Sequence, residues 1–271
     1  MELDARLRPG TFFRTGHRGA RGLAPENTLA AFSLGAELGV DIMELDIRAT
    51  SDGEIVVLHD SSIDRTTDGT GEVAELSWEQ LSTFDAGYRF TPDDGASHPF
   101  RGQGIRVPRL QDVLNAFPEH AFTVELKPSP LRDFVARAVA VLRDRAPTRT
   151  ILASAEHGLL RAARREAPEM VSSSSGAEVR NFALLTKVGL GGLYRRSPGR
   201  VFQAPPTSGG DVRTGVSVVT PYFVRAAHRG GRCVQVWTIN DPDEMRAFIA
   251  MGVDGITTDR PDVLNDVLDR R

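Results

Sequence analysis

Short hydrophobic runs alternate along the chain with longer segments in which apolar residues recur at helical spacing. This alternation is typical of parallel βαβ units, and it predicts an α/β fold. The runs that we interpret as strands span residues 12–16, 41–47, 55–59, 122–127, 150–154, 170–173, 201–205, 233–239 and Gly255–Thr258.

The architecture that we expect is a TIM-type (β/α)8 barrel, although the sequence predicts one strand more than the eight of such a barrel. The turn-forming pair Asp52-Gly53 joins the second and third runs with no room for a crossover helix, so these two runs could form a hairpin. The sequence leaves open which of the nine segments lies outside the barrel.

Capping residues indicate where two helices begin. Asn27 is expected to cap the helix that follows it, and Ser77 with Gln80 has the spacing of a capping box. The tripeptide Glu26-Asn27-Thr28 is accordingly interpreted as a helix cap in preference to a catalytic element.

Two irregular segments interrupt the alternation. Residues 60–108 are polar and glycine-rich and contain little more than the short helix expected after Ser77, so we interpret them as an insertion over the barrel mouth. Residues 172–215 contain a run of four serines and a candidate helix, which we assign to the same domain. No long polar linker divides the 271 residues, so we predict a single domain over residues 1–271.

Composition and charge exclude several classes of protein. The chain has 40% hydrophobic and 25% charged residues and a formal net charge of −3, so it lacks the basic excess of a nucleic-acid-binding protein. No apolar stretch approaches the roughly 20 residues that span a bilayer, and we expect a cytoplasmic protein without stable membrane association. The single Cys233 excludes an intrachain disulfide and a cysteine-rich zinc site.

Two predicted strands carry charged pairs inside apolar runs. Glu44 and Asp46 are two residues apart, as are Glu125 and Lys127, so each pair shares one face of its strand. In an α/β barrel such charges are tolerated near the C-terminal strand ends, where active sites lie. Convergence of Glu44, Asp46 and Glu125 would form a hard oxygen site for one divalent cation, Mg²⁺ or Ca²⁺, with Mn²⁺ as a further candidate.

Cationic and imidazole groups accompany these carboxylates. Arg18 offers a planar fork to phosphate oxygens, and Lys127 offers a point charge. Three carboxylates, one divalent cation, Arg18 and Lys127 sum to about +1, which matches the single negative charge of a phosphodiester. His17 and His59 are the candidates for general acid and general base, because imidazole titrates near neutral pH.

The chain resembles the glycerophosphodiester phosphodiesterase family, in its bacterial cytosolic form, over most of its length. The segments that carry the resemblance are, in order, His17-Arg18-Gly19, Glu26-Asn27-Thr28, Glu44 with Asp46, His59-Asp60, Arg65-Thr66-Thr67, Glu125 with Lys127, and Thr258-Asp259-Arg260-Pro261. Each motif is weak alone, and their joint occurrence in one order is the specific signal.

The resemblance implies a metal-dependent barrel enzyme that hydrolyses glycerophosphodiesters to an alcohol and sn-glycerol 3-phosphate. One histidine would deprotonate the nucleophile and the other would protonate the leaving alcohol, with water or a vicinal glycerol hydroxyl as the nucleophile. It also implies that Trp237 lies beside the substrate, whereas the residue alone would be assigned to the core. His98, His120, His157 and His228 are assigned structural roles.

Two other functions stay open. A lysophospholipase D or phospholipase D-like activity could use the same barrel and would need an apolar groove or amphipathic helix at the mouth. A metal-dependent binder of phosphorylated ligands would keep the same residues and show no turnover. The headgroup, the preferred metal, the assignment of acid and base and the oligomeric state are left open by the sequence.

Overall fold

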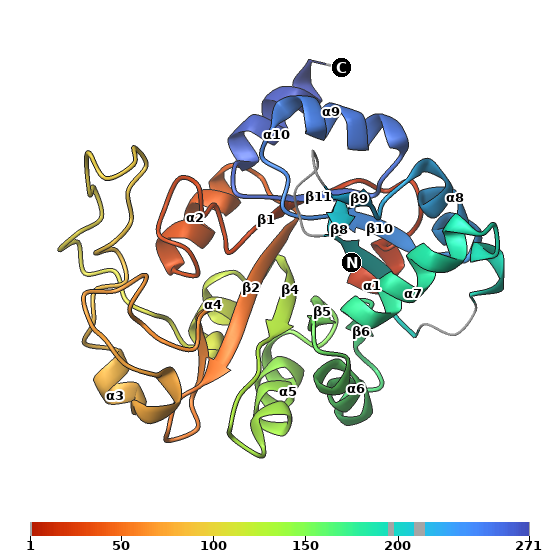
Figure 1. Ribbon diagram of the computed structural model, residues 1–271. Coiled ribbons are helices and arrows are strands. Elements are labelled where there is room, and N and C mark those ends of the chain that lie inside the picture. Colours follow the sequence, from red (N-terminus) through yellow and green to blue (C-terminus); the bar gives the residue numbers. More distant parts are fainter. Residues whose placement is uncertain (1, 195–197, 209–214, 271) are drawn as a thin grey trace.

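The computed structural model describes residues 2–194, 198–208 and 215–270, and within these ranges eight parallel strands form a barrel (Figure 1). Their order is β6-β5-β4-β2-β1-β11-β10-β7, and a bridge between Ser173 and Val201 joins its two ends. The predicted TIM-type barrel is confirmed. The strands are β1 (Phe13–Gly16), β2 (Ile42–Ala49), β4 (Ala121–Leu126), β5 (Thr150–Ala153), β6 (Val171–Ser172), β7 (Val201–Ala204), β10 (Cys233–Val236) and β11 (Gly255–Thr258).

A helix follows each barrel strand and lies on the outside of the barrel (Figure 1). These helices are α2 (Leu29–Glu37), α4 (Leu110–Ala116), α5 (Phe134–Arg145), α6 (His157–Glu166), α7 (Gly176–Lys187), α8 (Pro221–Arg229), α9 (Pro242–Met251) and α10 (Pro261–Asp269). Further short elements are α1 (Leu3–Arg6), α3 (Trp78–Leu81), the 3-10 helices η1 (Val73–Glu75) and η2 (Gly191–Leu193), and the paired strands β8 (Thr207–Ser208) and β9 (Val216–Ser217).

Of the nine predicted strands, the one outside the barrel is β3 (Ile55–Val57), which pairs antiparallel with β2. The pairing aligns Ile47 with Val57 and Ala49 with Ile55, so the Asp52-Gly53 turn closes a hairpin. Gly53 has a φ of 88°, a left-handed conformation that favours glycine. The hairpin prediction is therefore confirmed, and β3 is the surplus strand.

One of the two capping predictions is wrong. Thr28, not Asn27, caps α2, and its side-chain oxygen accepts a hydrogen bond from the Ala31 backbone N–H. Asn27 has a φ of 57°, whereas a capping residue has extended backbone. Its side chain does not cap the helix and donates to Asp46. The capping box of Ser77 and Gln80 at the start of α3 is confirmed.

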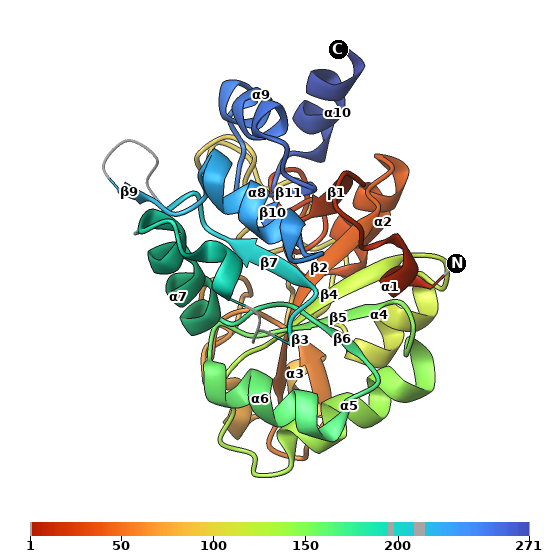
Figure 2. The ribbon, with the colours of Figure 1, turned by 90° about the vertical axis from the view of Figure 1, so that its right-hand side faces the viewer.

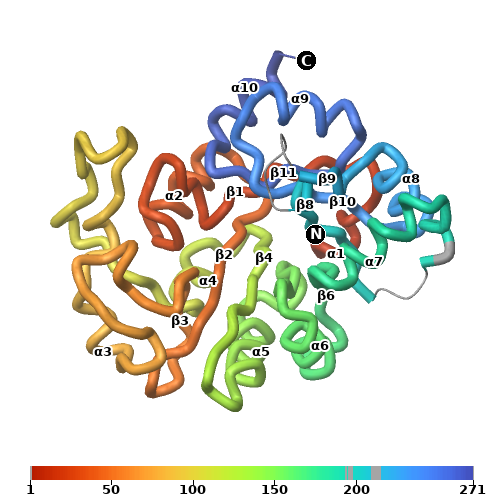
Figure 3. The backbone as a smooth tube through the Cα atoms, in the orientation of Figure 1, coloured from red at the N-terminus to blue at the C-terminus, as the bar shows by residue number. Residues whose placement is uncertain are grey.

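The insertion after β3 lies beside the barrel, next to β2 and α2, and not over its mouth (Figures 1 and 3). It has a small hydrophobic core of its own, which anchors it on the β2–β3 hairpin. The buried members of this core are Val56, Leu58, Ile63, Val73, Leu81, Ala86 and Val107. From the insertion, the side chains of Asp60 and Arg65 reach the site described below.

The barrel interior is layered from apolar to polar. At the N-terminal strand ends, Leu3 of α1 and Leu7, which follows this helix, pack against Phe13, Ile42 and Cys233. Figure 2 shows α1 and the N-terminus on the side of the barrel opposite to α7 and β9. Since successive side chains of a strand alternate, Met43, Leu45 and Ile47 face the outer helices, and Glu44 and Asp46 face inward, above the apolar layer.

The segment from 172 to 215 contains α7 and β7, as the candidate helix and strand predicted, while its parts at 195–197 and 209–214 lie outside the described residues. Among the residues that are described, no helix is both long enough and apolar enough to cross a membrane. The assignment of residues 1–271 to a single domain stays a prediction.

Burial makes the Cys233 thiol unreactive. Burial, with a smaller contribution from Asp254, raises the pKa of Cys233 to about 12, so almost no thiolate is present at neutral pH. We expect no reaction with an aromatic disulfide reagent at pH 8 in the native protein, and one thiol per chain after addition of denaturant. Rapid reaction of the native protein would contradict this packing of the barrel's N-terminal end.

Candidate active site

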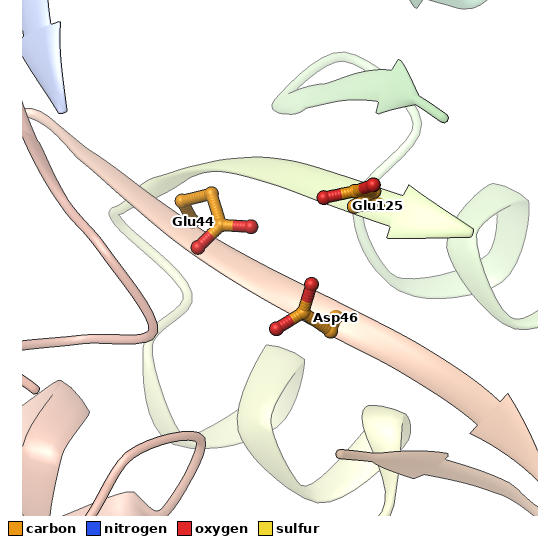
Figure 4. Close-up of side chains that lie close together, drawn as sticks. All are labelled: Glu44, Asp46 and Glu125. Atoms are coloured by element: carbon orange, nitrogen blue, oxygen red, sulfur yellow. The ribbon is translucent and has the colours of Figure 1, made fainter. Parts of the chain in front are cut away.

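Three carboxylates converge where β2 and β4 run side by side. The register pairs Asp46 with Glu125, and Glu44 lies one step earlier on the same face of β2 (Figure 4). One carboxylate oxygen from each residue lies within 4.8 Å of the other two. The convergence expected from the two-residue spacing is therefore present.

The cluster concentrates negative charge away from water. Glu44 and Asp46 are 7% and 1% exposed. Burial, reinforced by the neighbouring charge of Asp46, raises the pKa of Glu44 to about 7. Such a set of hard oxygen donors fits a divalent cation, which would offset the charge that the protein leaves unbalanced.

Lys127 supplies part of the compensating positive charge. Its Nζ lies 3.0 Å from Asp46 Oδ1 and 2.9 Å from Glu125 Oε2. Burial raises the pKa of Asp46, but Lys127 and Arg18 outweigh burial and hold it below the ordinary value. Asp46 is thus held in its ionised form, whereas Glu44, with its pKa near 7, is only partly ionised at neutral pH.

Arg18 is held by a tight turn after β1. Its φ is 50°, and the following Gly19 has a φ of 89° and no room for a side chain, since a Cβ would lie 2.6 Å from the Ala31 backbone. The Arg18 N–H donates to Glu44 Oε2 at 2.9 Å, and its guanidinium forms an ion pair with Asp46 at 3.1 Å. The turn therefore places a cation directly beside the carboxylate cluster.

Each of the two candidate histidines is oriented by an aspartate. His17 Nδ1 lies 2.6 Å from Asp259 Oδ1, and His59 Nδ1 lies 2.6 Å from Asp60 Oδ1. An ionised carboxylate only accepts hydrogen bonds, so Nδ1 carries the proton in both rings and Nε2 is left to exchange protons. His17 Nε2 lies 3.9 Å from Glu44, so this ring faces the cluster.

The environments of the two Asp–His pairs differ. Asp259 follows β11, which pairs with β1, and it also accepts a hydrogen bond from Asn240 Nδ2 at 2.9 Å. Burial lowers the pKa of the His59 imidazole below its ordinary value, although Asp46 and Asp60 oppose this shift. A neutral His59 can accept a proton through Nε2.

A cavity of about 790 Å³ connects the candidate residues. Its polar end is lined by His17, Arg18, Glu44, His59, Glu125 and Lys127. Its opposite wall includes Val179, Ala183 and Leu184 of α7, together with Trp237, which is 44% exposed. The assignment of Trp237 to the core is therefore wrong, because its ring follows β10 and lies at the mouth of this cavity.

Sequence reasoning missed four residues of the site. Asn27 donates from Nδ2 to Asp46 Oδ2 at 2.9 Å, and Glu26 accepts from Arg18 at 2.7 Å, so the segment interpreted as a cap belongs to the charge network. Asp60 and Asp259 had no assigned role. Their signal was their place directly after predicted strands, where barrel enzymes hold catalytic groups.

Fold and site together define a barrel enzyme whose acidic centre lies at the C-terminal strand ends, between two Asp-oriented histidines. Residues 17–263 match the model of the glycerophosphoryl diester phosphodiesterase family. The chain belongs to this family, whose members hydrolyse glycerophosphodiesters, and it is a phosphoric diester hydrolase.

Relatives match along nearly the whole chain. A glycerophosphodiester phosphodiesterase of Caldanaerobacter subterraneus is 29% identical over 92% of this chain and 94% of its own length. The crystal structure of a glycerophosphodiester phosphodiesterase from Agrobacterium tumefaciens is 28% identical, with a TM-score of 0.75 over 94% of this chain and all of that one. A phosphodiesterase of Oleispira antarctica, solved with the product sn-glycerol-3-phosphate, is 24% identical, with a TM-score of 0.73 over 95% of this chain and 96% of that one.

Replacement of Asp259 by Asn tests the orientation of His17. The amide keeps the shape of the carboxylate, but it can present an N–H to Nδ1 and so favour the wrong tautomer. We expect kcat for a glycerophosphodiester to fall by about 10²-fold or more. Asp262→Asn is the matched control, because the Asp262 side chain forms its ion pair with Arg260 and contacts neither histidine among the described residues. Equal rates for both variants would contradict a role of Asp259 in positioning His17.

Proposed function

We propose that the protein hydrolyses glycerophosphodiesters to an alcohol and sn-glycerol 3-phosphate by a metal-dependent, two-histidine mechanism. The observation that supports this proposal best is the placement of the carboxylate cluster between His17 and His59, with both rings in the same cavity. Cleavage of a P–O bond requires a base for the nucleophile and an acid for the leaving oxygen. Two imidazoles with free Nε2 atoms can divide these tasks.

Glu44, Asp46 and Glu125 would hold the cation. Mg²⁺ and Ca²⁺ are the candidates that fit all-oxygen ligands, and Mn²⁺ is compatible with the same donors. When bound, the cation supplies positive charge that polarises the phosphodiester and stabilises the developing negative charge. Arg18 and Lys127, which already flank Asp46, would orient the non-bridging phosphate oxygens from the sides of the cluster.

Substrate placement follows from the cavity. The phosphodiester would lie at the polar end, near His17 and Arg18, with the alcohol or the glycerol toward Trp237. The Oleispira antarctica relative was solved with sn-glycerol-3-phosphate, which supports this product for the present chain. The site would then hold the phosphate between cations and the two proton-transfer groups.

Removal and replacement of the metal test the reaction itself. Protein stripped with a chelator should release no glycerol 3-phosphate from glycerophosphocholine, and addition of Mg²⁺, Ca²⁺ or Mn²⁺ should restore release. Full activity after exhaustive stripping would contradict metal dependence. Binding of glycerol 3-phosphate without turnover, with the metal restored, would favour the non-catalytic binder.

Histidine variants test the division of proton transfer. His17→Ala and His59→Ala should each lower kcat by about 10² to 10⁴-fold, because each removes one proton-transfer group. His98→Ala is the control, since His98 lies in the insertion and contacts the Phe90 backbone oxygen. A wild-type rate in either site variant would refute its assigned role.

One observation favours the lipid alternative. Val179, Ala183 and Leu184 of α7 line the cavity alongside the charged Arg180 and Lys187 of the same helix. Leu184 is 58% exposed, and Trp237, which lines the same cavity, is 44% exposed. An acyl chain of a lysophospholipid could lie against this wall while its phosphodiester occupies the polar end. The apolar surface that was not evident in the insertion is thus provided by α7.

Leu184→Asn distinguishes the two substrate classes. If lysophospholipids are substrates, the variant should lower kcat/KM for them by roughly tenfold, because it removes the hydrophobic contact of the Leu184 side chain with the acyl chain. The rate with glycerophosphocholine should stay unchanged. Leu29→Asn is the matched control, because Leu29 is 41% exposed and does not line the cavity. Equal losses for both substrates would argue against an acyl-chain wall.

A further inference from the structure

One arginine of the insertion binds two carboxylates of the site at once. Arg65 Nε donates to Asp60 Oδ2 at 2.5 Å, while its two terminal nitrogens donate to the two oxygens of Glu26 at 2.8 and 2.6 Å. Glu26 side-chain exposure is 9%, so its charge depends on such partners. A planar guanidinium suits this arrangement, because it can direct several N–H groups toward two acceptors in one plane.

Each of these carboxylates also holds a group of the candidate site. Asp60 uses its other oxygen, Oδ1, to accept the hydrogen bond from His59 Nδ1. Glu26 accepts a second hydrogen bond through Oε1, from Arg18 at 2.7 Å. Arg65 is therefore the link between the partner of a histidine and the partner of the arginine beside the metal cluster.

The loop that carries Arg65 is braced by the insertion. The Ile63 N–H donates to the Gly71 carbonyl at 3.0 Å, and the Gly71 N–H donates to Asp64 Oδ1 at 2.9 Å. Thr67, which is fully buried, donates from its hydroxyl to the Ile63 carbonyl at 2.9 Å. These contacts hold the loop that carries Arg65 in place, while Asp60 and Glu26 fix its guanidinium.

Arg65 does not line the cavity, whereas Arg18 and His59 do. We propose that Arg65 is a positioning residue, which fixes His59 and Arg18 relative to each other through Asp60 and Glu26. This proposal rests on the proposed function for its effect on rate, and on the contacts alone for its effect on the His59 ring. The insertion thereby contributes to the active site without covering it.

Kinetics of Arg65 variants provide the first test. Arg65→Ala should lower kcat by about 10²-fold, since loss of orientation at two groups is comparable to a misplacement of about 1 Å. Arg65→Lys should recover only a small part, because one ammonium cannot hold both carboxylates in a plane. Guanidinium ion added at millimolar concentration should raise the rate of Arg65→Ala and leave that of Arg65→Lys unchanged.

Arg143→Ala is the matched control. The Arg143 side chain is 47% exposed, like that of Arg65, and it donates to Glu169 and to the Glu166 carbonyl on the outside of the barrel. Arg143→Ala should leave the rate unchanged, and added guanidinium should not raise it. A similar loss of rate in both variants would show that loss of a surface ion pair accounts for the effect, and would overturn the proposal.

Nitrogen NMR of the imidazole rings separates this proposal from the proposed function. In the wild-type protein, His59 should show a single tautomer with the proton on Nδ1, and Arg65→Ala should shift it toward a mixture of tautomers, while His17 keeps its signals. An inactive wild-type protein with this shift would refute the proposed function and leave the positioning role supported. Unchanged His59 signals in a folded Arg65→Ala protein would overturn the positioning role, whatever the rate.

Discussion

The rest of the site is arranged around the negative charge that Glu44, Asp46 and Glu125 share inside the barrel. Three carboxylates in a space of a few ångströms repel one another, and burial removes the water that would screen them. Lys127 and Arg18 compensate part of this charge and keep Asp46 ionised. Burial, reinforced by the charge of Asp46, raises the pKa of Glu44, and the negative charge that remains makes a divalent cation the natural complement of the site.

The barrel topology brings the other groups of the site close to these three carboxylates. β1 lies between β2 and β11, so the loops after these strands bring Arg18, His17 and Asp259 to one side of the cluster. The β2–β3 hairpin, which breaks the regular alternation, brings His59 and Asp60 to the other side. An apolar layer at the N-terminal strand ends, which includes Leu3 of α1, supports the arrangement from the opposite end of the barrel.

Local sequence patterns were sufficient to predict much of the fold and of the candidate site. The spacing of Glu44 and Asp46 on an apolar strand placed both carboxylates on one face, and Asp52-Gly53 indicated the hairpin. The partner of His17 could not be found in this way, because Asp259 is separated from it by 242 residues and meets it only when β11 pairs with β1. Asn27 and Thr28 are both good capping residues, and the choice between them depends on the buried Asp46 that attracts the Asn27 amide. The position of the insertion likewise depends on packing that no local pattern encodes.

Anomalous diffraction from crystals grown with Mn²⁺ would locate the metal independently of any assay. We expect one strong peak at coordination distance from carboxylate oxygens of Glu44, Asp46 and Glu125, and loss of that peak in Asp46→Asn crystals. A fully loaded crystal with no peak at this cluster, or with its peak at another site, would contradict the claim that the carboxylates form the metal centre.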